Sequence, residues 1–239
     1  MSFVINTNTA AANAANNLSA SNAQLQNSLN KLSSGSRIVK ASDDAGGLAV
    51  SMKLTTAALS AGAAVAKDAN ETSFLQAQDG VLQVMGNVLT RMSQLSALAK
   101  DTSVDTSQYG TEFTSLATEL GALAGATYNG TKLTAGIGGL SAVTVTTTGL
   151  TIGAGVDTEI GQIASARAAN GAAQSSLGYD SQVQTATKTN LDAAAGQISN
   201  VDVATEATNL AKWNVMVQYG ASMLAQANQT TQVALKLIQ

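Results

Sequence analysis

Residues 210–239, LAKWNVMVQYGASMLAQANQTTQVALKLIQ, carry the clearest periodic pattern in the chain. Apolar or small residues recur there at alternating steps of three and four, at Leu210, Trp213, Val217, Gly220, Leu224, Ala227, Thr231, Ala234 and Ile238. A mean step of about 3.5 residues is the repeat of a left-handed coiled coil. Because one helix cannot bury such a stripe by itself, the pattern predicts that a helix over residues 201–237 packs against a second helix.

A narrower stripe of the same kind lies near the other end of the chain. Between residues 9 and 34, the side chains of Leu18, Leu25, Leu29 and Leu32 fall on one helical face, and Asn, Ser and Gln fill much of the rest. A stripe this narrow is typical of a coiled-coil seam rather than of a helix that lies on a broad core. We therefore predict that the two terminal helices pair with each other.

Between these ends the sequence predicts three further helices. The chain contains no Pro, which permits long uninterrupted helices. Gly35 is expected to end the first helix, and Asp43 and Asp44 to cap the next. The expected helices span residues 44–100, 107–126 and 159–195. In the first of them, a second coiled-coil face is predicted by steps of four and three at Val81, Met85, Val88, Met92, Leu95 and Ala99.

The centre of the chain has a different character. Residues 128–131, Tyr-Asn-Gly-Thr, indicate a turn. Alternating β-branched residues then follow at 142–148 with glycines on both sides, and they predict a β-hairpin within residues 133–160. The predicted fold class is therefore mainly α: a long helical coiled-coil rod formed by the paired N- and C-terminal regions, with one small central β-hairpin.

The composition removes most kinds of active site. The 239 residues include no His and no Cys, so the commonest acid–base, thiol and metal-binding side chains are missing. Asp43 and Asp44 form a carboxylate pair, but Ala-Gly-Gly follows them, which favours helix capping over metal binding. We expect no catalytic residue, no cofactor and no metal site, and hence no enzyme.

Charge and hydropathy limit the partners. Charged residues make up 11% of the chain and the formal net charge is −3, without the basic stripe of a nucleic-acid-binding protein. By inspection of the sequence, no stretch is long and apolar enough to cross a bilayer, so we expect no membrane insertion. The first ten residues, MSFVINTNTA, lack the basic segment and apolar core of a cleavable signal peptide. A chain of this kind that leaves the cell needs another export route.

Six motifs, four near the start and two near the end, carry a resemblance to a known family. They are Ile5-Asn-Thr-Asn8, Asn17-Leu18, SLNKLSSGSRI at 28–38, ASDDAGGLAVS at 41–51, DVATE at 202–206 and GASMLAQANQ at 220–229. In this order they closely resemble the terminal signatures of bacterial flagellin. The chain departs from the family pattern at Lys31, Gly46 and Trp213, where Arg, Ala and a residue other than Trp are usual. The resemblance covers all but about residues 133–160, which implies a short form without large outer domains.

This resemblance implies a structural subunit that polymerises into the bacterial flagellar filament used for swimming motility. Residues 1–43 and 198–239 would form the inner filament-core domain, and residues 44–197 an outer helical rod with the hairpin. The implied polymerisation and coiled-coil core consists of Leu18, Leu25, Leu29, Leu32, Leu210, Trp213, Val217, Leu224 and Ile238. A hook–filament junction protein shares similar terminal helices, but its signatures are normally less faithful. A secreted metallopeptidase built on the same ends would need an HExxH motif, which a chain without His does not have.

The resemblance also implies partners beyond copies of the same chain. These are the flagellar export apparatus, an export chaperone on the C-terminal helix, and the hook-associated junction and cap proteins. The protein would be secreted without a cleavable signal peptide and would reside in the extracellular flagellum. Residues 89–97 resemble the segment that a vertebrate innate-immune receptor reads in many flagellins. Arg91, Leu95 and Glu112 would then be receptor contacts.

Overall fold

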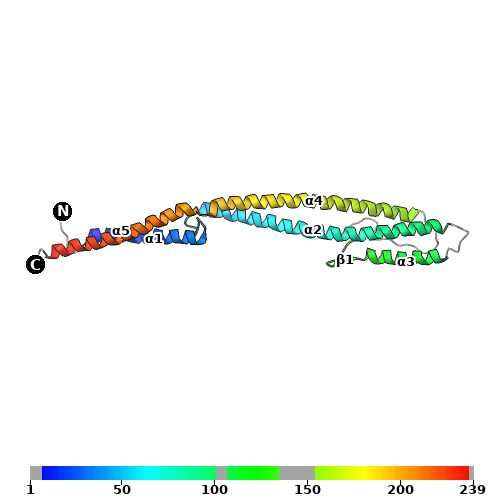
Figure 1. Cartoon of the computed structure of the whole chain (residues 1–239), viewed down its shortest axis with the longest axis horizontal. Coiled ribbons are helices and arrows are strands. Elements are labelled where there is room, and N and C mark those ends of the chain that lie inside the picture. The colour runs from blue at the N-terminus through cyan, green and yellow to red at the C-terminus, as the bar shows by residue number, and fades with distance from the viewer. Residues whose placement is uncertain (1–6, 101–106, 135–153, 237–239) are drawn as a thin grey trace. The chain divides into compact units, whose positions relative to one another are not determined.

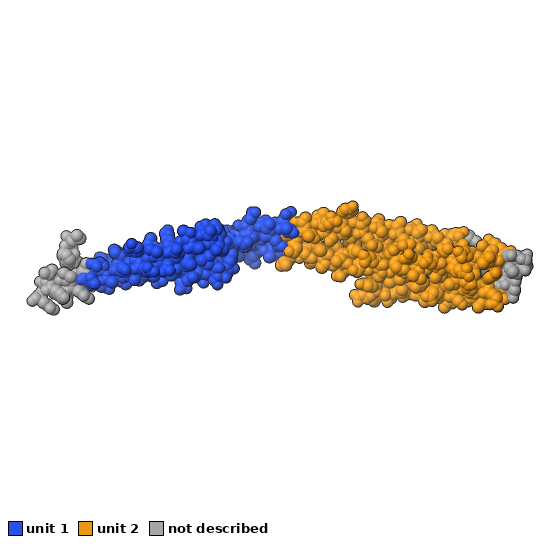
Figure 2. Space-filling model, in the orientation of Figure 1, with its two compact units in different colours: residues 1–58, 189–239 blue, residues 59–188 orange. Residues whose placement is uncertain are grey.

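The computed structural model describes residues 7–100, 107–134 and 154–236. Within them it contains five helices and one two-stranded sheet, in the order α1 (Thr9–Ser34), α2 (Ala45–Leu98), α3 (Ser107–Ala124), β1 (Thr127–Tyr128), β2 (Thr131–Lys132), α4 (Ala154–Ser199) and α5 (Val203–Lys236) (Figure 1). The chain divides into two compact units, residues 1–58 with 189–239 and residues 59–188 (Figure 2). The prediction of a mainly α fold with one small hairpin is confirmed.

Local caps determine where the helices begin and end. The side chain of Asn8 accepts a hydrogen bond from the backbone N–H of Ala11 (2.9 Å), and α1 ends at Gly35, whose φ is 67°. Glycine adopts this left-handed conformation without a steric penalty. Asp202 caps α5 by accepting a hydrogen bond from the N–H of Ala204 (3.0 Å). Because such caps depend on adjacent residues, the bounds predicted for the first helix agree with α1, and the other bounds differ by only a few residues.

The first unit contains α1 and α5, which lie side by side and antiparallel (Figure 1). Asn8, just before α1, donates its side-chain N–H to the carbonyl oxygen of Ala227, late in α5 (3.0 Å). Ser28, near the end of α1, bonds to Glu206 in the first turn of α5. Contacts between residues so far apart in sequence confirm the predicted pairing of the terminal helices.

The second unit is built around an apolar core. Its buried members are Leu82, Met85, Leu89, Met92 and Leu95 of α2, Phe113 and Leu120 of α3, and Val156 and Ile163 of α4. Ion pairs join the same helices: Arg91 of α2 with Glu112 of α3 (2.7 Å), and Asp79 of α2 with Arg167 of α4 (2.9 Å). In this unit α2 therefore faces two neighbouring helices.

The repeat predicted for this part of α2 is only partly right. Met85, Met92 and Leu95 are fully buried, but Val81 and Val88 are only half-buried. The central positions belong instead to Leu82 and Leu89, which are also fully buried. A helix with two neighbouring helices buries a broader face than a helix with one neighbour. The predicted stripe, which assumed one neighbour, therefore included Val81 and Val88 at the edge of this face and left out Leu82 and Leu89.

A small hairpin lies just before the segment in which one was predicted. Thr127 pairs with Lys132 and Tyr128 with Thr131, so the strands flank a two-residue turn. The turn residues, Asn129 and Gly130, have φ values of 48° and 79°, as in the type I′ turns that favour Asn-Gly. Of the segment predicted to form the hairpin, residues 135–153 lie outside the described residues, and residues 154–160 belong to α4.

One helix in the described part of the chain passes a length-and-composition test for a membrane span. An 18-residue window of α2 has a mean hydropathy of 1.4, and 11% of that window is buried. The expectation that no stretch is long and apolar enough is wrong by this measure. A single such helix is weak evidence for a membrane. Its exposure indicates an apolar surface that the chain itself does not cover.

Within the first unit, the loop after α1 is fastened to the junction before α5. The backbone N–H of Arg37 donates to the carbonyl oxygen of Ser199 (2.7 Å), and that of Val201 donates to Gly35 (3.0 Å). The guanidinium group of Arg37 also pairs with Asp44 at the start of α2 (3.2 Å). We refer to these five residues as the clasp.

The space for the Asp44 carboxylate depends on Gly47. Asp44 accepts a hydrogen bond from the N–H of Gly47 (2.7 Å), and this bond, with help from Arg37, lowers the pKa of Asp44 below its usual value. A Cβ atom on Gly47 would overlap that carboxylate, whose Cγ would be 2.7 Å away. A Cβ atom on Gly46 would lie 3.8 Å from the same carboxylate, which is an ordinary contact.

We expect Gly47→Ala to lower the free energy of unfolding, because the added methyl group displaces Asp44 from both the helix cap and Arg37. The lowered pKa means that this stabilisation is present above the usual pKa of aspartate and is lost as the pH falls through the folded-state value. Gly46→Ala is the matched control and should be neutral or slightly stabilising. Thermal unfolding followed by circular dichroism over a pH series measures the stability of both variants. Equal losses of stability in Gly47→Ala and Gly46→Ala would contradict the role of the clasp.

Candidate functional site

The pairing face of α1 and α5 follows a regular three–four alternation. On α1 the half-buried or buried positions, apart from Lys31, are Ala11, Ala14, Leu18, Ser21, Leu25, Ser28 and Leu32. On α5 they are, apart from Asn209, Glu206, Leu210, Trp213, Val217, Gly220, Leu224 and Ala227. We call these fourteen residues the seam. Seven of the nine residues predicted for the coiled-coil core lie in it. The side chain of Ile238, the last of the nine, lies outside the described residues.

Leu29 is the predicted core residue that the structure places elsewhere. Its side chain is 46% exposed, whereas Ser28 beside it is 3% exposed. The prediction stepped four residues from Leu25 to the next leucine, but the alternation requires a step of three at that point. A polar residue therefore occupies the seam position, and Leu29 lies on the outer face of α1.

Ser28 reaches a charged partner inside the seam. Its hydroxyl group donates a hydrogen bond to the carboxylate of Glu206, which is 8% exposed. A polar pair within an apolar seam disfavours other alignments, because a slipped helix would leave the carboxylate facing apolar side chains. We infer that this pair fixes the register of α1 on α5. Sequence reasoning missed it, although the three–four alternation counted outward from Leu18 and Trp213 would have identified both positions.

The helices approach closely where Leu18 packs against Gly220. A Cβ atom on Gly220 would lie 3.1 Å from Leu18 Cδ1 and 3.3 Å from Leu18 Cβ, which is tighter than normal packing. The small seam residues Ala11, Ala14 and Ser21 lie on the same face of α1. Small side chains thus permit close packing here, as they do at other tightly packed helix contacts.

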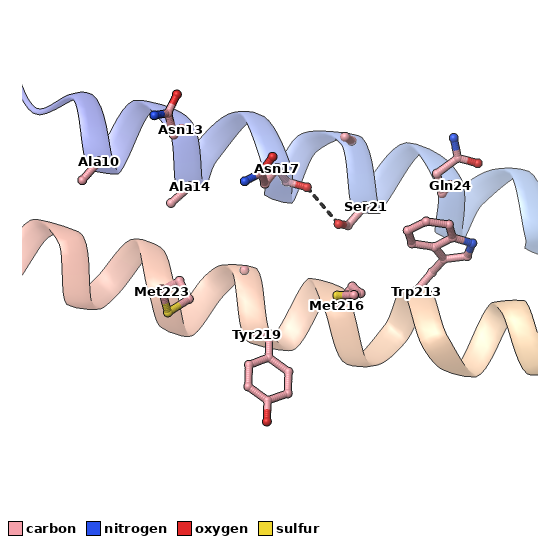
Figure 3. Close-up of a pocket in the computed structure, with 12 residues that line it drawn as sticks. Ala10, Asn13, Ala14, Asn17, Ser21, Gln24, Trp213, Met216, Tyr219 and Met223 are labelled. Atoms are coloured by element: carbon pink, nitrogen blue, oxygen red, sulfur yellow. Dashed lines mark hydrogen bonds between the residues drawn. The ribbon is translucent and has the colours of Figure 1, made fainter.

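Beside the seam runs an open groove of about 660 Å³. Small or polar residues of α1 form one wall, including Ala10, Ala14, Asn17, Ser21 and Gln24, and larger residues of α5 form the other, namely Trp213, Met216, Tyr219 and Met223 (Figure 3). Figure 3 shows Trp213 pointing toward α1 beside Gln24, whereas Tyr219 points away from α1. None of the lining residues is charged. The groove therefore suits an apolar, uncharged partner surface.

The apolar side chains of α5 extend beyond this groove. Tyr219 and Met223 are 67% and 61% exposed, and Met216 and Val215 are about half exposed. They form a second apolar stripe on the side of α5 that α1 does not cover. The amino group of Lys212 lies 5.0 Å from the centroid of the Trp213 ring, within the range of a cation–π contact.

The predicted receptor contacts separate into two groups. Arg91 and Glu112 form a two-bond ion pair on the surface (2.7 and 3.1 Å). Their mutual hydrogen bonding is the main cause that raises the pKa of Arg91 and lowers that of Glu112. Leu95, by contrast, is fully buried in the core of the second unit. The surface that a partner could reach therefore consists of the ion pair without Leu95.

The described residues offer little for catalysis or metal binding. Among them no group of three or more His, Cys, Asp or Glu side chains could hold a metal ion. The groove carries no ionisable acid or base other than the phenol of Tyr219. An open, uncharged groove of this kind is suited to packing against another protein surface.

We expect Gly220→Ala to push α1 away from α5, because Leu18 has no room for an extra methyl group. Overpacking of this kind typically lowers the free energy of unfolding by about 1–3 kcal/mol. Gly178→Ala is the matched control, since a Cβ atom on that helical glycine meets nothing within 4 Å. It should stabilise the protein by about 0.5–1 kcal/mol. Thermal unfolding and the fluorescence of Trp213, the single Trp in the chain, measure both effects; equal responses would contradict close packing at the seam.

Comparison with known proteins identifies the family. A model described as the bacterial flagellin N-terminal helical region matches residues 5–138, and one described as the bacterial flagellin C-terminal helical region matches residues 154–238. The chain is 30% identical to the flagellar filament 33 kDa core protein of Treponema phagedenis, with 99% of this chain and 100% of that protein aligned. It is 30% identical to the flagellin of Listeria monocytogenes and 28% identical to that of Bacillus subtilis, with 98% of this chain and 99% of each relative aligned. The chain therefore belongs to the bacterial flagellin family.

Proposed function

We infer that this chain is a structural subunit that polymerises with copies of itself into the bacterial flagellar filament, the extracellular fibre used for swimming. The family is structural, and the chain is not an enzyme. The observation that carries this function is the match of both helical regions of the family along one chain whose ends pair. Its relatives align along nearly their whole length, so no large additional domain separates them from this chain.

We propose that the groove and the outer stripe of α5 form a contact with a neighbouring copy. Met216, Tyr219 and Met223 expose large apolar surfaces, which monomeric proteins usually keep small. The groove is uncharged, and the chain as a whole carries few charges. No like charges within the groove therefore oppose the approach of two copies, and burial of these side chains supplies the driving force.

We propose the domain roles that the resemblance implies. Residues 1–43 and 198–239 form the inner filament-core domain, and residues 44–197 form the outer domain. Support for the inner role comes from the seam and the groove, which both lie on α1 and α5. Within a filament, neighbouring copies also cover the exposed apolar window of α2, which requires no membrane.

The proposed partners outside the polymer fit particular surfaces. An export chaperone on residues 201–239 would cover the seam face of α5 before α1 occupies it. The export apparatus would pass the chain outward, and junction and cap proteins would meet the filament at its ends. For a vertebrate innate-immune receptor, the accessible feature is the Arg91–Glu112 ion pair.

Seeded assembly tests the proposed contact. Purified protein is mixed with short filament fragments or a precipitating salt, and the products are imaged by electron microscopy. The wild-type protein should form hollow tubes. Tyr219→Ser should raise the critical concentration for assembly by about tenfold or more, because burying an aromatic side chain is worth at least 1.4 kcal/mol, about one factor of ten.

Tyr179→Ser provides the matched control, because Tyr179 on α4 is 68% exposed, almost the same as Tyr219. It should shift the critical concentration by about twofold or less, as surface substitutions away from packed features do. Wild-type assembly by Tyr219→Ser would exclude the groove as a subunit contact. Failure of the wild-type protein to form tubes on authentic seeds would argue against the filament function itself.

A further inference from the structure

Two Asn-Gly dipeptides occur in the chain, Asn129-Gly130 and Asn170-Gly171. This dipeptide has a specific reactivity, because the backbone nitrogen after Asn can attack the side-chain amide carbon. Glycine lacks a Cβ atom, so it permits the close backbone approach that the attack requires. The structure places the two dipeptides in opposite surroundings, and the function proposed above uses neither.

Asn129 lies at the exposed tip of the hairpin. It has a φ of 48° and Gly130 a φ of 79°, and a Cβ atom on Gly130 would meet nothing within 4 Å. No hydrogen bond from the described part of the chain holds the side-chain amide of Asn129. Only two residue pairs close the turn. The tip therefore has both the space and the local freedom to rearrange.

The base of the hairpin is held firmly by the rest of the unit. Leu133 and Thr134 are buried, and the N–H of Leu133 donates to the carbonyl oxygen of Ala126 (3.0 Å). The hydroxyl group of Thr134 donates to Ala124 (2.8 Å), and Gln78 of α2 donates to the carbonyl oxygen of Leu133. Opening of the tip thus leaves the base and the core in place. Such local openings cost far less free energy than global unfolding.

Asn170 is held in the middle of α4 and is 4% exposed. Its side-chain N–H donates to the carbonyl oxygen of Leu75 (2.9 Å) and to the side chain of Gln78 (3.3 Å). Its side-chain oxygen accepts a hydrogen bond from Gln174 (2.8 Å). The backbone N–H of Gly171 belongs to the helix. These hydrogen bonds hold the side-chain amide of Asn170 in place. The backbone nitrogen of Gly171 cannot attack it unless α4 unfolds locally.

We propose that Asn129 is a site of spontaneous deamidation in the folded protein, and that the same dipeptide at Asn170 is protected. A base in solution takes the proton from the backbone nitrogen of Gly130, and that nitrogen bonds to the side-chain carbonyl carbon of Asn129. The bond from this carbon to the amide nitrogen breaks, and ammonia leaves with the proton it needs from water. Water then opens the cyclic imide at either carbonyl, which gives aspartate or isoaspartate at position 129.

The reaction changes the hairpin without touching the core. Either product adds one negative charge to the turn, and isoaspartate also lengthens the backbone, so it no longer fits a two-residue type I′ turn. The affected neighbour is Tyr128, whose ring meets Phe74 of α2 edge to face, with centroids 6.1 Å apart. The change is thereby confined to the exposed tip of the hairpin in the second unit.

Peptide mapping by mass spectrometry tests this proposal on the full-length protein. Folded protein is incubated at mildly alkaline pH, sampled over time and digested, with isoaspartate peptides separated by chromatography. Asn129 should deamidate at least about tenfold faster than Asn170, because only local opening is required. In a denaturing concentration of urea the two sites should react at similar rates. Equal rates in the folded protein, or faster reaction at Asn170, would overturn the proposal.

A second variant tests whether the tip is independent of the core. Asn129→Asp mimics one product and should keep the thermal midpoint of the wild-type protein. Asn170→Asp is its matched control and should lower that midpoint clearly, because it places a carboxylate against the carbonyl oxygen of Leu75. If Asn129→Asp lowered the thermal midpoint as much as Asn170→Asp does, the tip would be coupled to the core, and the local-opening mechanism would be overturned.

Discussion

The contact of Leu18 with Gly220 brings together two ends of the chain that are about 200 residues apart, and the rest of the first unit depends on it. Close approach is possible only because small residues line this part of the seam. Once the helices touch there, Ser28 can reach Glu206 and Asn8 can reach Ala227. The clasp then fixes the loop after α1 to the junction before α5, so both connections to the second unit leave from one place.

Sequence alone predicts the features that depend on neighbouring residues. Gly35 and Asp44 act within a few positions of themselves, so the end of α1 and the start of α2 could be located. The seam of α5 could be predicted because its apolar repeat is regular. Ser28 and Glu206 were missed because only apolar residues were assigned to the stripes, although the alternation itself reaches both positions. The phase of α2 was missed because a helix pattern does not reveal that two neighbours cover it. The hairpin at 127–132 forms around the Asn129-Gly130 turn, which is a local signal, whereas the β-branched residues at 142–148 lie outside the described residues.

Charges contribute little to holding this chain together. The ion pairs Arg37–Asp44, Lys67–Glu71, Arg91–Glu112 and Arg167–Asp79 lie on the surface, where screening by solvent leaves such pairs with little net stabilisation. Stability must therefore come from packing of apolar and small side chains. In the second unit a three-helix core supplies it, with six large side chains fully buried. None of these six side chains lies in the first unit, which depends more on the seam between α1 and α5 and on smaller buried residues such as Ile38, Ala58 and Ala195.

An isolated pair of helices can bury only one stripe on each helix, and this limit connects the fold to the filament. α5 carries two apolar stripes, of which α1 covers the seam and leaves Met216, Tyr219 and Met223 exposed. A third surface is required to cover them, and under the proposed subunit contact a neighbouring copy of the chain supplies it. Polymerisation would then bury the apolar side chains that folding of a single chain leaves exposed.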